Sequence, residues 1–454
     1  MIYVDHSNDI EPDSIFISIN NGYKHLSAKE IELVSEIWSS ESTTINLDKV
    51  KVIPYLDSKV LQIIEDDYGL VLEDFENFFI TGTNGKTTSA QFVSQILNIN
   101  NINNGVMGTL GCYINGKNIA SQRLTTETPI YIRNFLKKCL DRNTTKIIYE
   151  ASSIGIESNR LEGLSIDHSG FTNFTRDHLD HHKNMPNYLK AKLELVKNTK
   201  NSFTYNLDDD SSNNWIKAFS GESKFSISCI KPSADIFFSV RKIYSDGKIA
   251  FDIYSPWGSS EGCAPVFTDF NLVNIFIGLP FLMHQGLAFD SFISSLSLIN
   301  LPTGRQKLIK YKSNKIFIDY AHTPDAVEKL LSGLSRLKSV KTTLIIGAGG
   351  NRDHGKRSLM GSISSKYANH IIITSDNPRG EDPQLIADMI AEGIEQTASY
   401  EVILDRAKAI TTAIKKLTCD ETLVIIGKGH EDYQIIGNKR FHFSDEEEVN
   451  KCIT

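Results

Sequence analysis

The sequence predicts an α/β protein with mostly parallel sheets, divided into three domains. Seven short apolar runs end in small or polar residues, and helical patterns lie between many of them: NFFITGTNG, TKIIYEASS, SGFTNFTRDH, KIFIDYAHT, TTLIIGAGG, HIIITSDNP and TLVIIGKGH. Continuous apolar runs are typical of strands that a parallel sheet buries on both faces. At 454 residues the chain is too long for one core, and a size of about 150 residues per domain predicts three domains.

The predicted domain boundaries lie near residues 77 and 301. Three of the apolar runs precede residue 180 and four follow residue 315, while the segments ADIFFSVRKIY and GKIAFDIYSP alternate as hairpin strands do. Pro302 and Gly304 mark the second junction. We therefore expect a small α/β domain over residues 1–77, a central domain over 78–300 and a C-terminal domain over 301–454.

Composition and charge exclude several classes of protein. The net charge of −7 is small for this length, with both signs interspersed, which disfavours a nucleic-acid partner. The N-terminus lacks the basic start and apolar core of a secretory signal, and the apolar window NLVNIFIGLPFLMHQGLAF is interrupted by polar residues and proline, which predicts buried helix and no membrane partner. Six cysteines without a CxxC pair indicate reduced thiols and no zinc site. We expect a cytoplasmic monomer.

The segment TGTNGKTT follows the first apolar run and precedes a helical pattern. Glycines let backbone N–H groups close on phosphate oxygens, a lysine meets the β/γ charge, and a hydroxyl binds Mg²⁺. A general phosphate loop has glycine where Ile80 stands, so a tight strand-to-helix turn is the alternative. The residues predicted to bind the nucleotide here are Gly82, Thr83, Asn84, Gly85, Lys86, Thr87 and Thr88.

The shortened loop resembles that of the Mur ligase superfamily, ATP-dependent amide ligases that include the muramyl-peptide synthetases and folylpolyglutamate synthetase. The resemblance implies a central domain with a sheet like that of P-loop ATPases and a C-terminal domain with a Rossmann-like fold. It also implies that ATP and Mg²⁺ are the cofactors.

A second group of candidates comprises Glu150, at the end of the run KIIYE, and the histidine-rich segment TNFTRDHLDHH. From the residues alone, a metal site is no better supported than a polar loop beside a cation-rich helix face. EASSI, TNFTRDHLDHH and YLKAK resemble the motifs of family members that add the third residue of the muramyl peptide. The resemblance implies that Glu150 and His178 hold Mg²⁺ with Thr87, and that Lys192 serves as a carbamate. With Lys86, the residues Glu150, His178 and Lys192 form the expected catalytic set.

Further motifs extend this resemblance along the chain. LTTET and IESNRLEG imply an acceptor site formed by Thr125, Thr126, Ser152 and Arg160, and the planar fork of an arginine suits a carboxylate. PTGRQ, IFIDYAHT, IIGAGGNRDHGKRSLMG, TSDNPRGEDP and VIIGKGHEDYQ resemble the family's C-terminal domain in order and spacing. Together with DFNLVN they imply ATP contacts from Asn274, Arg305, Asp319 and His322.

DNPR is the most discriminating motif. Family members that add meso-diaminopimelate carry an arginine here, whereas lysine-adding members usually do not. Arg379 would pair with the distal carboxylate, and Glu431 would accept from the distal ammonium. The alternative is that Arg379 simply pairs with Glu381 or Asp382 on the surface. The implied amino-acid site comprises Arg352, Asn377, Arg379, Gly427 and Glu431.

The implied reaction is ATP-dependent addition of diaminopimelate to UDP-N-acetylmuramoyl-L-alanyl-D-glutamate through an acyl phosphate. Both substrates are small molecules. Three departures from the family pattern leave alternatives open: HSNDIEPDSIF lacks the aspartate, arginine and glycine of the family's N-terminal motif, Ile154 replaces a histidine, and Asn351 replaces an aspartate. The first alternative is a paralogous ligase that acts on a carboxylate without UDP. The second is a nucleotide-binding regulatory protein without catalytic activity.

Overall fold

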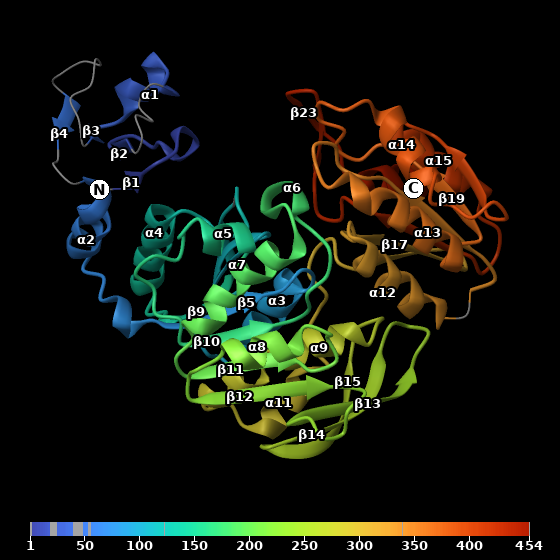
Figure 1. The fold of residues 1–454 in the computed structure, drawn as a ribbon, viewed down its shortest axis with the longest axis horizontal. Helices are drawn as coiled ribbons and strands as arrows, with labels where there is room; N and C mark the ends of the chain where they lie inside the picture. The colour runs from blue at the N-terminus through green and yellow to red at the C-terminus, as the bar shows by residue number, and fades with distance from the viewer. Residues whose placement is uncertain are drawn as a thin grey trace.

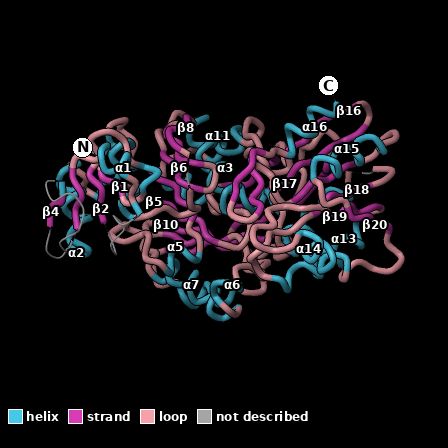
Figure 2. Tube along the Cα trace, turned by 90° about the horizontal axis from the view of Figure 1, so that it is seen from above, coloured by secondary structure: helices cyan, strands magenta, loops and turns pink. Residues whose placement is uncertain are grey.

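The computed structural model describes residues 2–18, 25–39, 49–52, 56–121, 123–337 and 339–453. Three sheets, each with its own helices, follow one another in chain order from the N-terminal end to the C-terminal end (Figure 1). Seen from above, the N- and C-terminal parts lie at opposite ends of the long axis (Figure 2). The predicted α/β fold class with mostly parallel sheets is confirmed.

The N-terminal sheet is parallel throughout, in the order β1-β2-β3-β4. Its elements are β1 (Tyr3–Val4), η1 (Ser7–Asp9), β2 (Ile15–Ser18), α1 (Ala28–Leu33), β3 (Glu36–Ser39), β4 (Val50–Val52), α2 (Leu56–Tyr68) and η4 (Leu72–Asp74). The Tyr68 hydroxyl accepts from the backbone N–H of Tyr3 and donates to Asn134 of the central domain at 2.7 Å. This hydroxyl therefore links the first strand to the neighbouring domain.

The central sheet has the strand order β15-β14-β13-β12-β11-β10-β5-β9-β6-β7-β8. Its strands are β5 (Glu76–Thr81), β6 (Gly105–Gly108), β7 (Gly111–Ile114), β8 (Lys117–Ala120), β9 (Lys146–Glu150), β10 (His168–Phe171), β11 (Ser202–Asn206), β12 (Ser223–Ser228), β13 (Ile236–Ile243), β14 (Ile249–Ser255) and β15 (Gly258–Ala264). The strands from β13 to β6 pair in parallel, and the strands at both edges pair antiparallel. Its helices are α3 (Lys86–Ile99), α4 (Pro129–Leu140), α5 (Ser153–Glu157), α6 (Leu179–His182), α7 (Met185–Lys197), α8 (Ser212–Ala218), α9 (Phe270–Phe276), α10 (Leu279–His284) and α11 (Phe289–Ser295).

The C-terminal sheet has the order β16-β17-β21-β18-β19-β20, in which only β16 runs antiparallel to its neighbour. Its strands are β16 (Lys307–Tyr311), β17 (Asn314–Asp319), β18 (Thr342–Ile346), β19 (His370–Ile373), β20 (Ser399–Val402) and β21 (Thr422–Ile426), with a separate hairpin of β22 (Tyr433–Ile436) and β23 (Lys439–His442). Its helices are α12 (Pro324–Ser335), η5 (His354–Lys356), α13 (Arg357–Tyr367), α14 (Pro383–Ala391), α15 (Arg406–Lys416) and α16 (Asp445–Ile453).

All seven apolar runs form strands inside the two large sheets, namely β5, β9, β10, β17, β18, β19 and β21. Strand β5 shows why such a run is apolar throughout. Phe78 and Ile80 pack into one buried cluster, whereas Phe79 packs on the opposite face, where its ring stacks on Tyr149 at 4.7 Å between ring centroids. The interrupted apolar window forms the buried helices α9 and α10. Within the described ranges, no helix is long and apolar enough to span a membrane.

Candidate active site

The phosphate loop connects the end of β5 to the start of α3. Gly82 and Gly85 have φ angles of +147° and +89°, and a Cβ at either position would overlap the side chain of Thr172 or Asn274. Glycine is therefore required at both positions. Gly85 caps α3, so the free N–H groups of its first turn face the pocket and favour an anion.

Lys86, the first residue of α3, is held by the loop itself. Its Nζ donates to the carbonyl oxygens of Gly82 and Thr83, each at 2.9 Å. Burial lowers the pKa of this ammonium, and the carboxylates of Glu150 and Asp177 partly oppose that shift.

Glu150 ends β9 in a pocket of hydroxyl groups. Its Oε2 accepts from the Thr87 hydroxyl at 2.7 Å and from the Thr109 hydroxyl at 3.1 Å, and its Oε1 accepts from the Thr109 N–H at 2.7 Å. Burial raises the pKa of this carboxyl, while Thr87 and then Lys86 act to lower it. Among the described residues no cation lies within 4 Å of the carboxylate, so the group fits a cation supplied from outside the chain.

A second buried carboxylate, Asp177, lies among three basic side chains. Its oxygens are 3.4 Å from Lys356 Nζ, 3.5 Å from His178 Nε2 and 3.8 Å from His322 Nε2. Burial acts to raise the pKa of Asp177, but the Lys356 ammonium and a hydrogen bond with His322 outweigh it and hold that pKa well below its ordinary value. Burial lowers the pKa of His178 to about 4, so this imidazole is neutral at pH 7. His178 also has a φ of +54°, a strained conformation for a residue with a side chain.

Lys192, on α7, lies beneath the phosphate loop. Its Nζ donates to the carbonyl of Gly82 at 2.7 Å and to the Thr81 hydroxyl at 3.3 Å. The side chain is 1% exposed. Burial, followed by the nearby charge of Lys86, holds the Lys192 pKa well below its ordinary value. Lys192 thus contacts the loop backbone directly, whereas no hydrogen bond or ion pair within the described chain joins it to Glu150 or His178.

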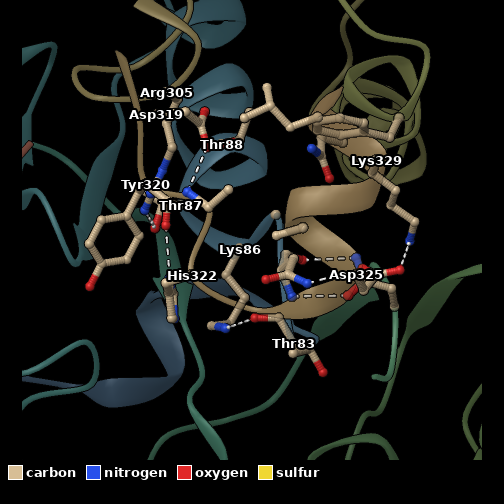
Figure 3. A pocket seen from close by; sticks show the side chains of 18 of the residues that line it. Thr83, Lys86, Thr87, Thr88, Arg305, Asp319, Tyr320, His322, Asp325 and Lys329 are labelled. Carbon is tan, nitrogen blue, oxygen red and sulfur yellow. Dashed lines mark hydrogen bonds and ion pairs between the residues drawn. The ribbon is translucent and has the colours of Figure 1, made fainter. Parts of the chain in front are cut away.

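The C-terminal domain closes the other side of the pocket (Figure 3). The Arg305 guanidinium lies over the Tyr320 ring at 4.3 Å and donates to the Thr87 hydroxyl at 3.4 Å. Asn84 of the loop donates to Asp325 of α12 at 3.1 Å. The pocket also contains Thr83, Lys86, Thr87, Thr88, Thr125, Glu150, His178, Asn274, Asp319, His322 and Lys329.

Two predicted ATP contacts also support this pocket structurally. Asp319 is buried and accepts from the N–H groups of Gln306 and Ala321 at 2.8 and 2.7 Å, so it fixes the turn that carries His322. Asn274 is held by Asn271 at 3.1 Å, with its side chain against Gly85.

The four predicted acceptor residues form one cluster next to Glu150. The Thr126 hydroxyl donates to the Glu150 carbonyl at 2.7 Å and lies 3.1 Å from the Ser152 hydroxyl. Arg160 donates to the Thr126 carbonyl at 2.8 Å, and the Thr125 hydroxyl lies 3.2 Å from that of Thr109.

The predicted amino-acid residues follow the carboxyl ends of the neighbouring strands β18, β19 and β21. Asn377 donates to Glu431 Oε2 at 2.8 Å, and buried Lys428 lies 3.2 Å from the same oxygen. Arg379 donates to the Gly350 carbonyl at 3.0 Å. The surface alternative for Arg379 receives no support from the described residues, because buried Arg357 is the residue that pairs with Glu381, at 2.8 and 3.0 Å.

The remaining two predicted residues border this cluster. A Cβ on Gly349 would lie 2.9 Å from the Arg379 guanidinium and 3.8 Å from the Arg352 side chain. The backbone of Gly427 has a φ of +109° and packs against Asp376.

Sequence reasoning missed several residues at this site. Thr109 binds Glu150 through both its N–H and its hydroxyl but belongs to no recognised motif. Asp177 and Lys428 lie in the segments RDH and GKGHE, next to residues that were predicted. Only the structure distinguishes them, because it shows that both charged side chains are buried.

Comparisons with known proteins agree with this geometry. Residues 80–280 match the Mur ligase middle domain, and residues 304–429 match the Mur ligase glutamate ligase domain. The UDP-N-acetylmuramoyl-L-alanyl-D-glutamate–2,6-diaminopimelate ligase of Rickettsia rickettsii is 35% identical over 418 residues, which cover 90% of this chain and 86% of the relative.

Two solved structures also resemble the chain. A UDP-N-acetylmuramoyl-L-alanyl-D-glutamate–2,6-diaminopimelate ligase superimposes with a TM-score of 0.64 at 28% identity, covering 100% of this chain and 94% of the other. The folylpolyglutamate synthase of Mycobacterium tuberculosis, solved with ADP and AMPPCP, shares the fold at a TM-score of 0.67 and 14% identity, covering 81% and 91% of the two chains. The chain therefore belongs to the Mur ligase family of ATP-dependent, ADP-forming ligases.

Proposed function

We propose that this protein uses ATP to join meso-diaminopimelate to the glutamate carboxylate of UDP-N-acetylmuramoyl-L-alanyl-D-glutamate. The observation that carries the proposal is the cluster around Asn377, whose side chain donates to the Glu431 carboxylate and whose carbonyl accepts from the Arg379 guanidinium. Such a pair matches an amino acid whose distal end bears both a carboxylate and an ammonium. The relatives at 30–35% identity carry the name of this activity.

The reaction begins with activation of the acceptor carboxylate. An oxygen of that carboxylate attacks the γ-phosphorus of ATP, which gives an acyl phosphate and ADP. Lys86 and Arg305 offset negative charge on the transferring group. Two N–H groups of the Lys86 ammonium donate to loop carbonyls, so the third can donate to a phosphate oxygen and further phosphate contacts replace those carbonyls.

Mg²⁺ fits this pocket because Thr87 and Glu150 present hard oxygen donors and Glu150 lacks a cation in direct contact. Neutral His178 offers a further donor in the same pocket. When bound, Mg²⁺ offsets the charge on the phosphoryl oxygens.

Lys192 is proposed to react with CO₂ to form a carbamate. Only a neutral amine adds to CO₂, and burial favours the neutral form of Lys192. The amine nitrogen forms a bond to the carbon of CO₂ and releases a proton, so the carbamate replaces a buried neutral amine with an anion and adds a negative group to the cation pocket.

The second step joins the amine to the activated carboxylate. Arg379 pairs with the distal carboxylate of diaminopimelate and Glu431 accepts from its distal ammonium, which leaves the other amine free. That amine, in its neutral form, attacks the acyl carbon, phosphate leaves, and the amide nitrogen loses a proton. Lys428 holds Glu431 in place from below, because its Nζ lies 3.2 Å from the carboxylate.

A phosphate-release assay with a panel of amines and acceptors tests the proposal. We expect activity with meso-diaminopimelate and the UDP-linked acceptor, and little activity with lysine. Arg379→Ala should raise the KM for diaminopimelate about 10- to 100-fold, since a lost charge-assisted pair is worth about 1.5–3 kcal/mol. Arg142→Ala, which removes an exposed arginine that donates to the Lys138 carbonyl in the central domain, is the matched control and should change KM less than twofold. Equal use of lysine and diaminopimelate by the wild type would contradict the proposal.

The same assay separates the two alternatives. Activity only with an acceptor that lacks UDP would identify a paralogous ligase, an outcome that the departures in HSNDIEPDSIF make worth testing. A regulatory protein without catalysis would release no phosphate with any pair, and Lys86→Ala would then leave its cellular role intact.

A further inference from the structure

Two clusters among the described residues bring two histidines and a glutamate within ligand distance of one another. In the first, Glu76 Oε1 lies 3.1 Å from His168 Nε2 and 3.0 Å from His284 Nε2. His168 Nδ1 lies 2.7 Å from the Ser202 hydroxyl, and Lys146 lies 3.9 Å from Glu76. Because protein groups contact the carboxylate and both nitrogens of the buried histidine, this cluster needs no ion.

The second cluster differs because it contains an unpartnered buried nitrogen. His181 Nε2 lies 2.7 Å from Glu157 Oε2, and His182 Nδ1 lies 3.5 Å from the same oxygen. The His182 side chain is completely buried, yet its Nδ1 has no hydrogen-bond partner in the structure. A buried polar atom without a partner costs about 1–3 kcal/mol and calls for an explanation.

One tautomer of His182 leaves Nδ1 free to bind a cation. Its Nε2 lies 2.9 Å from the Ser153 hydroxyl. When Nε2 donates to that hydroxyl, Nδ1 keeps its lone pair, which then faces the Glu157 carboxylate across 3.5 Å. Two electron-rich atoms facing each other repel, whereas a cation between them would satisfy both.

We propose that Glu157, His181 and His182 bind a transition-metal dication of the Zn²⁺ type, at a site separate from the Mg²⁺ pocket. Two imidazoles and one carboxylate form a donor set that suits Zn²⁺, Ni²⁺ or Cu²⁺, whereas Mg²⁺ prefers oxygen donors. Three protein ligands leave a fourth position for water.

The spacing of the three donors fits such an ion. Zn–N and Zn–O bonds near 2.1 Å in tetrahedral geometry put ligand atoms roughly 3.3 Å apart, and all three ligand atoms here lie within 4.8 Å of one another. Glu157 and His181 are about half exposed, so small rotations of these two side chains bring them to the ion while His182 stays fixed. The hydrogen bond that Nε2 donates to the Ser153 hydroxyl in this tautomer would orient His182 as outer partners of zinc ligands do.

The spacing of the cysteines predicted no zinc site, and the ligands proposed here include no cysteine. These ligands come from the end of α5 and the end of α6, and they are two adjacent histidines and a glutamate 24 residues before the first of them. The site also lies near the catalytic machinery. The His182 ring stacks on Tyr188 at 5.2 Å, and the Tyr188 hydroxyl lies 3.1 Å from Thr83 of the phosphate loop.

The test is Zn²⁺ binding to the full-length chain, measured by competition with a chromogenic zinc chelator in excess Mg²⁺. We expect one Zn²⁺ bound tightly, and at least a tenfold loss of affinity in both Glu157→Gln and His181→Gln. These two residues are exposed, so the variants should fold, which circular dichroism checks. Co²⁺ substitution provides a second readout, because the intense visible absorption of a four-coordinate ion should disappear in His181→Gln.

Three control variants locate the ion. His442 pairs with Glu447 at the same distance of 2.7 Å, but this exposed pair has no second histidine. His442→Gln should therefore leave the Zn²⁺ affinity within twofold of wild type. Glu150→Gln should also retain Zn²⁺, since it alters only the Mg²⁺ pocket. The proposal is overturned by the absence of Zn²⁺ binding, by unchanged affinity in Glu157→Gln and His181→Gln, or by loss of binding in Glu150→Gln or His284→Gln. Because every readout is metal binding, failure here leaves the proposed ligase activity untouched.

Discussion

The guanidinium of Arg176 forms a two-point salt bridge with the carboxylate of Asp353, with Nε–Oδ2 at 2.7 Å and Nη2–Oδ1 at 2.9 Å. Arg176 belongs to the central domain, two residues before His178, whereas Asp353 caps the N-terminus of the short helix η5 of the C-terminal domain. The neighbouring contact between Asp177 and Lys356 joins the same two segments. The two domains that must bring ATP and amine together are thus bridged beside the proposed metal ligand.

Removal of this bridge should reduce catalysis without unfolding either domain. Asp353 is buried but Arg176 is 41% exposed, so we expect the pair to stabilise the closed arrangement by about 1–2 kcal/mol. Arg176→Ala should lower kcat/KM about 5- to 30-fold, and Asp353→Ala should do the same. Adding the second mutation to the first should have little further effect in a double-mutant cycle.

The matched control is Arg241→Ala, which breaks an arginine–carboxylate pair within the β13–β15 region, and it should leave kcat/KM unchanged. Fully additive effects of the Arg176 and Asp353 mutations would show that the bridge does not couple the domains.

Lys192→Arg should abolish activity even though it keeps a long basic side chain at this position. A guanidinium does not form a carbamate and stays charged where burial disfavours charge. We expect at least a 100-fold loss of kcat, measured by phosphate release. Wild-type enzyme prepared in CO₂-free buffer should lose activity and regain it when bicarbonate is added. Equal rates with and without bicarbonate would contradict the carbamate proposal.

Glu381 should stabilise the C-terminal domain in a pH-dependent way. Hydrogen bonds from buried Arg357 lower the pKa of Glu381 to about 2 from its ordinary value of 4.5. A lowered pKa in the folded state gives stability that is complete above about pH 5 and declines as the pH falls from 4.5 towards 2.

Glu381→Gln should therefore lower the free energy of unfolding by about 2–3 kcal/mol at pH 7 and by less at pH 4. Urea unfolding at both pH values measures the difference. Glu447→Gln, in an exposed pair with His442, should cost under about 0.5 kcal/mol at either pH. A cost for Glu381→Gln that is constant between pH 7 and pH 4 would exclude this ionic role.

Asp445 and Arg406 form a completely buried ion pair, with contacts of 2.6 and 2.8 Å and no exposure of either side chain. Asp445→Asn leaves a guanidinium charge buried without its counterion, so we expect a loss of about 3–5 kcal/mol in unfolding free energy. Asp432→Asn breaks an exposed pair with Arg440 and should cost under about 1 kcal/mol. Comparable urea midpoints for the two variants would contradict the argument.

Local patterns in the sequence predict the strands and the phosphate loop well. Glu76–Thr81 and Thr422–Ile426 could be recognised because burial on both faces requires apolar residues throughout. The loop could be recognised because Gly82 and Gly85 adopt backbone conformations that exclude other residues. The candidate contacts of Arg379 came from resemblance, and its roles in binding remain predictions.

Contacts between distant segments could not be predicted in the same way. Arg176 and Asp353 are separated by 177 positions, and nothing in the residues around either one specifies the other. Thr109 follows strand β6, and its N–H meets Glu150 only because β6 and β9 pair in parallel. The orphaned nitrogen of His182 is likewise a property of packing, since the sequence shows a histidine but not its burial.

Lys86 donates hydrogen bonds to the carbonyls of Gly82 and Thr83, so these loop carbonyls compete with phosphate oxygens for the ammonium. The ammonium has three N–H groups, so an incoming nucleotide can bind the third directly but gains the other two only by displacing these carbonyls. The β- and γ-phosphates carry enough negative charge to compensate for the loss of these loop hydrogen bonds, whereas a monophosphate or a nucleoside carries much less. The resting loop therefore acts as a threshold that selects for phosphate number before any contact with the base is made.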